Sequence, residues 1–141
     1  MYLAPQKNKM QLESEKVHCS VSPEVVYDFL TGSFNNYREI MPDDVEHFEF
    51  DDSSFVFGMK GVPHIRLVNK ESIPHERIVL TAASSKLDFD LVLHLDKTPN
   101  GTDAWFSFEG DFNPMMQMMI KKPLQTFIDK LIQKISLRFN S

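Results

Sequence analysis

The sequence predicts an α+β fold in which a seven-stranded antiparallel sheet wraps around one long C-terminal helix, with two short helices between the first and second strands. Three observations support this prediction. Apolar residues recur at helical spacing near both ends of the chain. Between residues 45 and 112 they alternate with polar residues instead, a period of two that is typical of half-buried strands. The connections between these strands are too short for parallel pairing, so the sheet is antiparallel.

The first strand and the two short helices come before the main run of strands. Residues 10–20, MQLESEKVHCS, alternate loosely and contain no glycine or proline, which predicts one extended strand. Ser22 then provides a helix N-cap, Pro23 suits the first helical position, and Gly32 ends this helix. Residues 34–41 predict a second short helix that stops before the next proline.

Six further strands are joined by short, turn-rich segments. We expect them at residues 45–50, 54–60, 64–72, 77–83, 86–96 and 104–112. The fifth is the most regular, with leucines on one side and aspartates and a histidine on the other. Asn100 and Gly101 form the strongest short hairpin signal in the chain. A long helix follows, from an N-cap at Asn113 to about Phe139.

Composition indicates an acidic globular protein built as one domain. We expect residues 1–9 to be a flexible terminus and residues 10–141 to form that domain, which is long enough for a sizeable core. The net charge of −5 argues against nucleic acid as a partner. No segment approaches the ~20 apolar residues of a membrane span, so we expect no stable membrane insertion. Without a signal peptide, and with Cys19 as the only cysteine, the chain is predicted to be cytoplasmic and free of internal disulfides.

Four methionines lie within five residues, at Met115, Met116, Met118 and Met119. The apolar stripe of the helix changes phase at Pro123, and proline removes a helical hydrogen bond. We therefore expect an amphipathic helix from Pro123 onward and a methionine-rich turn before it, near one end of the sheet. These methionines could fill an irregular gap in the core or form a pliable wall for an apolar ligand. A soft-metal site for Cu(I) is a third interpretation, with little support from the apolar surroundings.

The polar residues form no recognisable catalytic or metal-binding motif. The five histidines show no H-x-x-x-H or H-E-x-x-H spacing, so we predict no metal site and no cofactor. His18 and Cys19 are neighbours on one strand and face opposite sides, which argues against a nucleophile–base pair. Alternation places His64, Arg66 and Glu109 on the outer, solvated face of the sheet. Only if one of them pointed inward would it be a candidate for orienting a substrate or for acid–base chemistry.

Residues 13–46, ESEKVHCSVSPEVVYDFLTGSFNNYREIMPDDVE, read as a strand, an SPE-V-DFL helix, a second short helix and a proline before the next strand. Together with the aromatic strand that precedes the long helix, this order resembles the START-like helix-grip superfamily. That superfamily includes the birch-pollen-allergen proteins, START lipid-transfer domains and polyketide cyclases, and the resemblance spans about residues 10–139. It implies a cavity for an apolar or amphipathic small molecule. It implies no catalytic residue, because the superfamily shares none, and the glycine-rich loop of the pollen-allergen branch is not evident.

We therefore predict a carrier or sensor of a small hydrophobic or amphipathic molecule, held between the sheet and the C-terminal helix. The predicted ligand-binding residues are Phe57, Ile65, Leu67, Leu80, Phe89, Leu91, Phe106, Phe108, Met116, Met119, Ile120 and Phe127. Two alternatives remain open. One is a cyclase- or hydrolase-type enzyme, which needs a titratable group inside the same cavity. The other is a protein-interaction module whose methionine segment is an exposed patch. The sequence does not determine the oligomeric state.

Overall fold

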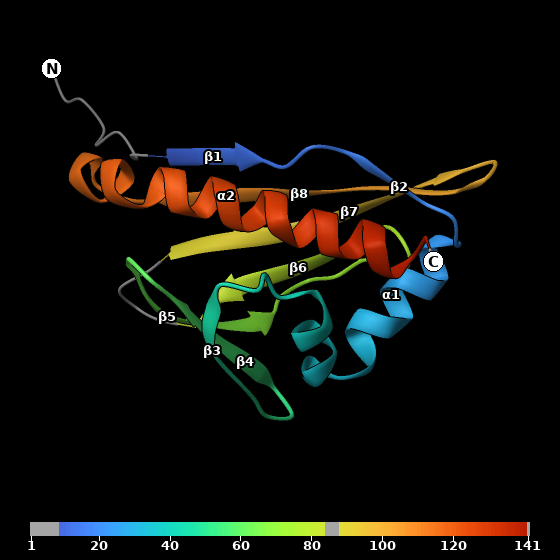
Figure 1. The fold of residues 1–141 in the computed structure, drawn as a ribbon, viewed down its shortest axis with the longest axis horizontal. Helices are drawn as coiled ribbons and strands as arrows, with labels where there is room; N and C mark the ends of the chain where they lie inside the picture. Colours follow the sequence, from blue (N-terminus) through green and yellow to red (C-terminus); the bar gives the residue numbers. More distant parts are fainter. Residues whose placement is uncertain (1–8, 84–87, 141) are drawn as a thin grey trace, which may run out of the picture.

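The computed structural model describes residues 9–83 and 88–140, in which one antiparallel sheet curves around a long helix (Figure 1). The strands are β1 Lys9–Glu13, β2 Val17–Cys19, β3 Val45–Phe50, β4 Ser54–Met59, β5 Val62–Asn69, β6 Arg77–Ala82, β7 Asp88–Thr98 and β8 Gly101–Asp111. The helices are α1 Pro23–Gly32, the 3-10 helix η1 Phe34–Ile40 and α2 Pro114–Arg138. The predicted fold class is confirmed, and the order of elements differs only in the first strand, which is divided so that the sheet has eight strands.

The strands follow one another across the sheet in the order β1-β8-β7-β6-β5-β4-β3, and β2 also pairs with β8. The single strand expected at residues 10–20 is therefore two strands, both antiparallel to β8. Between them, the Ser14 hydroxyl accepts a hydrogen bond from the Phe106 backbone N–H at 2.8 Å, and the Ser14 N–H donates to the Phe106 carbonyl at 2.9 Å. A serine side chain thus replaces one backbone acceptor, and the strand is interrupted there.

Helix α2 runs without a break through Pro123, so the interruption expected at that residue is wrong. Its buried stripe continues across the proline, because Ile120 before it and Leu124 after it both pack into the core. The stripe also includes Gln117, whose amide donates to the Phe112 carbonyl at 2.9 Å. Packing along this face holds the helix together despite the hydrogen bond that proline removes.

The sheet is buried on one face and open on the other, as the alternation along β7 and β8 predicted. Helix α2 packs against β1, β2, β8 and η1, while the β3–β4–β5 half of the sheet curves beneath it (Figure 1). His64, Arg66 and Glu109 are all exposed on the outer face, as expected. Cys19 is fully buried, as expected for a small core residue. No helix among the described residues is long and apolar enough to cross a membrane.

Candidate functional site

The space between the sheet and α2 contains a void of about 10 Å³, room for about one water molecule. Its lining residues are Tyr37, Ile40, Met41, Phe55, Leu67, Leu80, Leu91, Phe106, Phe127 and Leu131. None of these lining side chains carries a carboxylate, an imidazole, an amine or a thiol. Burial raises the pKa of the Tyr37 hydroxyl well above its usual range, so that group stays neutral near pH 7. The void therefore offers apolar contact and no acid–base group.

Aromatic rings fill most of the interior in which the family resemblance implied a cavity. The rings of Phe57 and Phe127 stack with centroids 4.7 Å apart and 3° between their planes. Phe55 stacks on Tyr37 with centroids 4.6 Å apart. A second ring cluster, near the start of α2, consists of Phe89, Phe108 and Phe112. A ligand can enter this interior only if some of the rings move.

A groove of about 410 Å³ opens on the surface between α2 and the β3–β4 side of the sheet. Its lining residues are Asp44, Glu46, Met59, Lys60, Lys122, Pro123, Thr126 and Phe127. Phe127 also lines the interior void, so it is shared by the linings of the two spaces. The volume of the groove lies within the range of small-molecule sites, roughly 300–1,000 Å³. The groove and the void together form the candidate binding site.

The structure brings five of the twelve predicted ligand-binding residues together at the void: Leu67, Leu80, Leu91, Phe106 and Phe127. Phe57 is next to them, stacked on Phe127. Four others are buried elsewhere in the core, namely Ile65, Phe89, Phe108 and Ile120. Met116 is half-buried against that core. Met119 lies apart from all of these, because it is 63% exposed on the solvent side of α2.

The methionine segment is mostly on the surface. Met115 and Met118 are exposed like Met119, so filling a gap in the core can explain only Met116. These three side chains also lie outside the wall of the void and the lining of the groove. The exposure of these three methionines indicates that they form a patch on the surface.

Sequence reasoning missed half of the residues that line the void, for two reasons. Phe55 and Leu131 carried a usable signal, since Phe55 shares a face with Phe57 and Leu131 lies on the buried stripe of α2. Tyr37, Ile40 and Met41 carried none, because they belong to η1 and its end, where a short 3-10 helix has no sustained apolar period.

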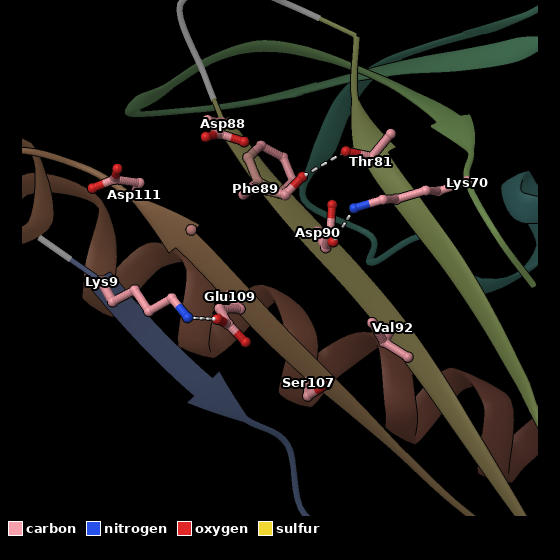
Figure 2. Close-up of a pocket in the computed structure, with 11 residues that line it drawn as sticks. Lys9, Lys70, Thr81, Asp88, Phe89, Asp90, Val92, Ser107, Glu109 and Asp111 are labelled. Carbon is pink, nitrogen blue, oxygen red and sulfur yellow. Dashed lines mark hydrogen bonds and ion pairs between the residues drawn. The ribbon is translucent and has the colours of Figure 1, made fainter. Parts of the chain in front are cut away.

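Charged residues on the outer face of the sheet form a separate polar groove of about 290 Å³ (Figure 2). Lys9 pairs with Glu109 at 2.5 Å, and Lys70 pairs with Asp90 at 3.0 Å. The Lys9 ammonium group lowers the pKa of the Glu109 carboxyl. Within residues 9–83 and 88–140, no three histidine, cysteine or acidic side chains gather as a metal ion requires. These pairs are surface ion pairs, which contribute little to stability.

His94 and Ser107 form a hydroxyl–imidazole contact on the outer face, with 2.8 Å between Nε2 and Oγ. Burial lowers the pKa of His94, and the positive charge of Arg77 lowers it further. The imidazole stacks on Trp105 with centroids 4.8 Å apart, and the Lys16 ammonium group lies 4.3 Å from the centre of the Trp105 ring. The contact is on the sheet face that points away from α2, so it cannot act on a molecule held in the void.

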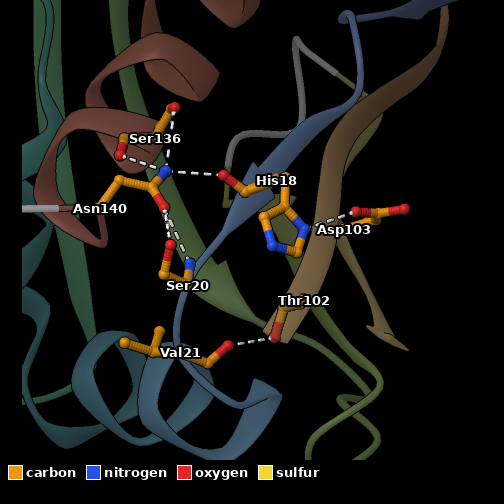
Figure 3. Close-up of polar contacts among 7 residues, drawn as sticks. All are labelled: His18, Ser20, Val21, Thr102, Asp103, Ser136 and Asn140. Atoms are coloured by element: carbon orange, nitrogen blue, oxygen red, sulfur yellow. Dashed lines mark hydrogen bonds and ion pairs between the residues drawn. The ribbon is translucent and has the colours of Figure 1, made fainter. Parts of the chain in front are cut away.

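The C-terminal end of α2 is fastened to β2 by Asn140 (Figure 3). The Asn140 side-chain oxygen accepts hydrogen bonds from the Ser20 backbone N–H at 2.8 Å and from the Ser20 hydroxyl at 2.6 Å. Its amide donates to the backbone carbonyls of His18 at 2.6 Å and Ser136 at 2.9 Å. This end of the helix is thereby held in place, whereas the groove lies along its other half.

No protein-family model matches the sequence, and no curated protein sequence matches it. Solved structures do match. The di-domain ARO/CYC StfQ from the steffimycin biosynthetic pathway matches with a TM-score of 0.69 and 11% identity, over 93% of this chain and 50% of StfQ. This chain therefore spans about half the length of StfQ.

Two further structures match along nearly their whole length. Norcoclaurine synthase from Thalictrum has a TM-score of 0.68 and 10% identity, over 95% of this chain and 98% of the synthase. Aha1 from Colwellia psychrerythraea, solved as a dimer, has a TM-score of 0.64 and 13% identity, over 93% of this chain and 96% of Aha1. At such identities the likeness establishes the fold alone. The chain therefore shares the fold of these structures, a curved antiparallel sheet around a long C-terminal helix, as its sequence predicted.

Proposed function

We propose that the protein binds a small, mainly apolar molecule, which enters between α2 and the β3–β4 side of the sheet. The observation that carries this proposal is the position of Phe127, whose ring lines both the groove and the void. The ring is 4% exposed and is held by its stack on Phe57. A change of the Phe127 rotamer joins the groove to the void and gives a ligand a continuous apolar path.

The energetics favour a ligand that is largely apolar. A stacked aromatic pair contributes about 0.5–1.5 kcal/mol beyond the area that it buries. Removing ~100 Å² of apolar ligand surface from water contributes about 2.5 kcal/mol. A ligand that buries this much surface can therefore offset the loss of the Phe57–Phe127 stack. A small polar molecule cannot.

The charged rim of the groove gives an amphipathic ligand a place for its polar end. Lys60 and Lys122 line opposite walls, one in the turn after β4 and the other on α2. Of the two acidic residues at the rim, Asp44 is paired with Lys130 at 3.3 Å. A polar or anionic headgroup at the rim therefore stays in solvent near two ammonium groups while the apolar part lies inside.

Fluorescence titration with 8-anilinonaphthalene-1-sulfonate tests this proposal, together with mass spectrometry of the organic extract of the purified protein. Met59→Trp places a large ring in the groove and should weaken dye binding by about tenfold or more. Met119→Trp is the matched control, since Met119 lines neither the groove nor the void, and it should leave binding unchanged. Equal dye binding by the wild-type protein and Met59→Trp would refute the proposed entry.

The alternative of an enzyme that acts on a molecule inside the void finds no support among the residues that line the void. A cyclase or hydrolase needs a group that moves a proton near pH 7. Among the described residues that line the void, Tyr37 has the only ionisable side chain, and burial keeps its hydroxyl protonated. We therefore favour a carrier or sensor.

A further inference from the structure

The N-terminal half of α2 presents three methionines to solvent, which we call the methionine patch. Met115, Met118 and Met119 are 74%, 85% and 63% exposed. Their spacing of i, i+3 and i+4 places them side by side on one helix face. Ile120 and Leu124 pack into the core on the opposite face. The patch is therefore contiguous, and contiguous exposed apolar surface is typical of an interaction site.

Two lysines belong to the same face. At 100° per residue, Lys122 projects between Met118 and Met119, and Lys121 lies beside Met118. Residues 113–128 contain these two lysines and no acidic residue, although the whole chain has a net charge of −5. Among the ion pairs of residues 9–83 and 88–140, none involves Lys121 or Lys122. An acidic protein thus has a positively charged, apolar face along half of its longest helix.

Asp44 and Glu46 line the groove beside Lys122, with Asp44 paired to Lys130, whereas four other acidic residues at this end of the molecule point away from the patch. Asp88, Asp90, Glu109 and Asp111 lie on the outer face of β7 and β8, and α2 passes behind these strands (Figure 2). The sheet therefore lies between these carboxylates and the patch. Their negative charge is directed to the opposite side of the molecule.

We propose that the methionine patch and its two lysines dock on an anionic lipid surface. The thioether side chains enter the boundary between headgroups and acyl chains, and Lys121 and Lys122 attract the anionic headgroups. A second copy of this chain fits the patch less well than a lipid surface does, because a symmetric dimer contact through the patch would bring four lysines together. The docking is peripheral and reversible, since it uses a few side chains of one helix.

The patch adjoins the candidate binding site. Lys122 borders the patch and lines the groove between α2 and the β3–β4 side of the sheet. Docking of this face would therefore place the groove mouth beside the lipid surface. The docking proposal goes beyond ligand binding and does not depend on it, since it rests on exposure and charge alone.

Cosedimentation with two kinds of vesicle tests the proposal, phosphatidylcholine alone and phosphatidylcholine mixed with phosphatidylserine. We expect binding to the mixed vesicles, little binding to the neutral ones, and weaker binding as salt screens the charges. Lys121→Gln with Lys122→Gln should lower the partition coefficient about fivefold for each lysine. Met118→Glu with Met119→Glu should abolish binding. Leu137→Glu is the matched control, because Leu137 is 71% exposed near the other end of α2 and should leave binding unchanged.

Circular dichroism of each variant establishes that a loss of binding is not a loss of folding. The proposal is overturned if the wild-type protein does not bind the mixed vesicles, or if the Met118→Glu, Met119→Glu double variant binds them as well as the wild-type protein does. It is also overturned if analytical ultracentrifugation shows that the wild-type protein is a dimer that does not bind vesicles, and that this double variant is a monomer. Dye binding in the groove is measured without lipid, so the outcomes of the two proposals are separate.

Discussion

Phe127 is the residue on which both the closed interior and the proposed entry depend. Phe127→Ala removes the ring between the groove and the void, so we expect the free energy of unfolding to fall by about 3–5 kcal/mol. The same change should strengthen binding of 8-anilinonaphthalene-1-sulfonate, because the two spaces become one. Urea denaturation and dye titration measure the two effects. Weaker dye binding by a folded Phe127→Ala protein would count against the entry.

Two glycines show how the surroundings of a residue determine how much stability is lost when a side chain is added there. A Cβ at Gly58 would lie 2.4 Å from the His64 ring, which stacks on His47, but this exposed ring can swing away. A Cβ at Gly101 would lie 2.1 Å from the Cys19 backbone oxygen, and its φ of +145° is unfavourable for other residues. Gly58→Ala should cost less than about 1 kcal/mol, and Gly101→Ala more than about 2 kcal/mol. Thermal or urea unfolding of both variants checks the order, and equal costs would contradict it.

His94 makes stability depend on pH in a definite direction. Its pKa is lowered in the folded protein, chiefly by burial, so the unfolded chain binds a proton that the folded chain resists. Stability should therefore fall as pH falls below the ordinary histidine value of about 6.5. His94→Gln keeps a hydrogen-bonding side chain beside Ser107 and should flatten the curve of unfolding free energy between about pH 7 and pH 5. An unchanged slope in urea titrations would show that another group is responsible.

At the scale of elements, α2 contains one proline that favours the helix and one that opposes it. Pro114 occupies the first turn, where its missing N–H is not needed, whereas Pro123 lies in the interior. Pro123→Ala should raise the free energy of unfolding by up to about 3 kcal/mol, because it restores a helical hydrogen bond. Pro114→Ala should change it little and is the matched control. Equal effects in urea denaturation would mean that the helix is relaxed at Pro123.

The elements also show which parts of the fold a sequence predicts well. Strands such as β7 and β8 were predicted because one face is buried and the other solvated, which leaves a clear period of two. The break at Ser14 was missed because it depends on a hydrogen bond to Phe106, 92 residues away in the chain. The break expected at Pro123 is wrong because local propensity predicts it, whereas packing of Ile120 and Leu124 keeps the helix continuous.

For the molecule as a whole, the sequence predicts the fold, but it does not predict how completely side chains fill the space between the sheet and α2. The alternation along the strands and the apolar stripe of the helix predict which side chains face inward. Five of the twelve predicted ligand-binding residues do meet at the void. Whether these side chains leave a cavity depends on their rotamers and on how closely α2 approaches the sheet. The Phe57–Phe127 stack closes the interior by such a detail of packing, which no period in the sequence reveals.

The pairing of β1 and β2 with β8 has a consequence for synthesis. Lys9 lies opposite Asp111 in the sheet, and Ser20 is bonded to Asn140 near the end of α2. A chain made from its N-terminus on the ribosome therefore presents its first two strands long before their partner strand exists. Such distant pairings fold slowly and leave apolar strand faces exposed in the meantime. The nascent protein therefore depends on its own final segments, or on a chaperone, to cover these faces.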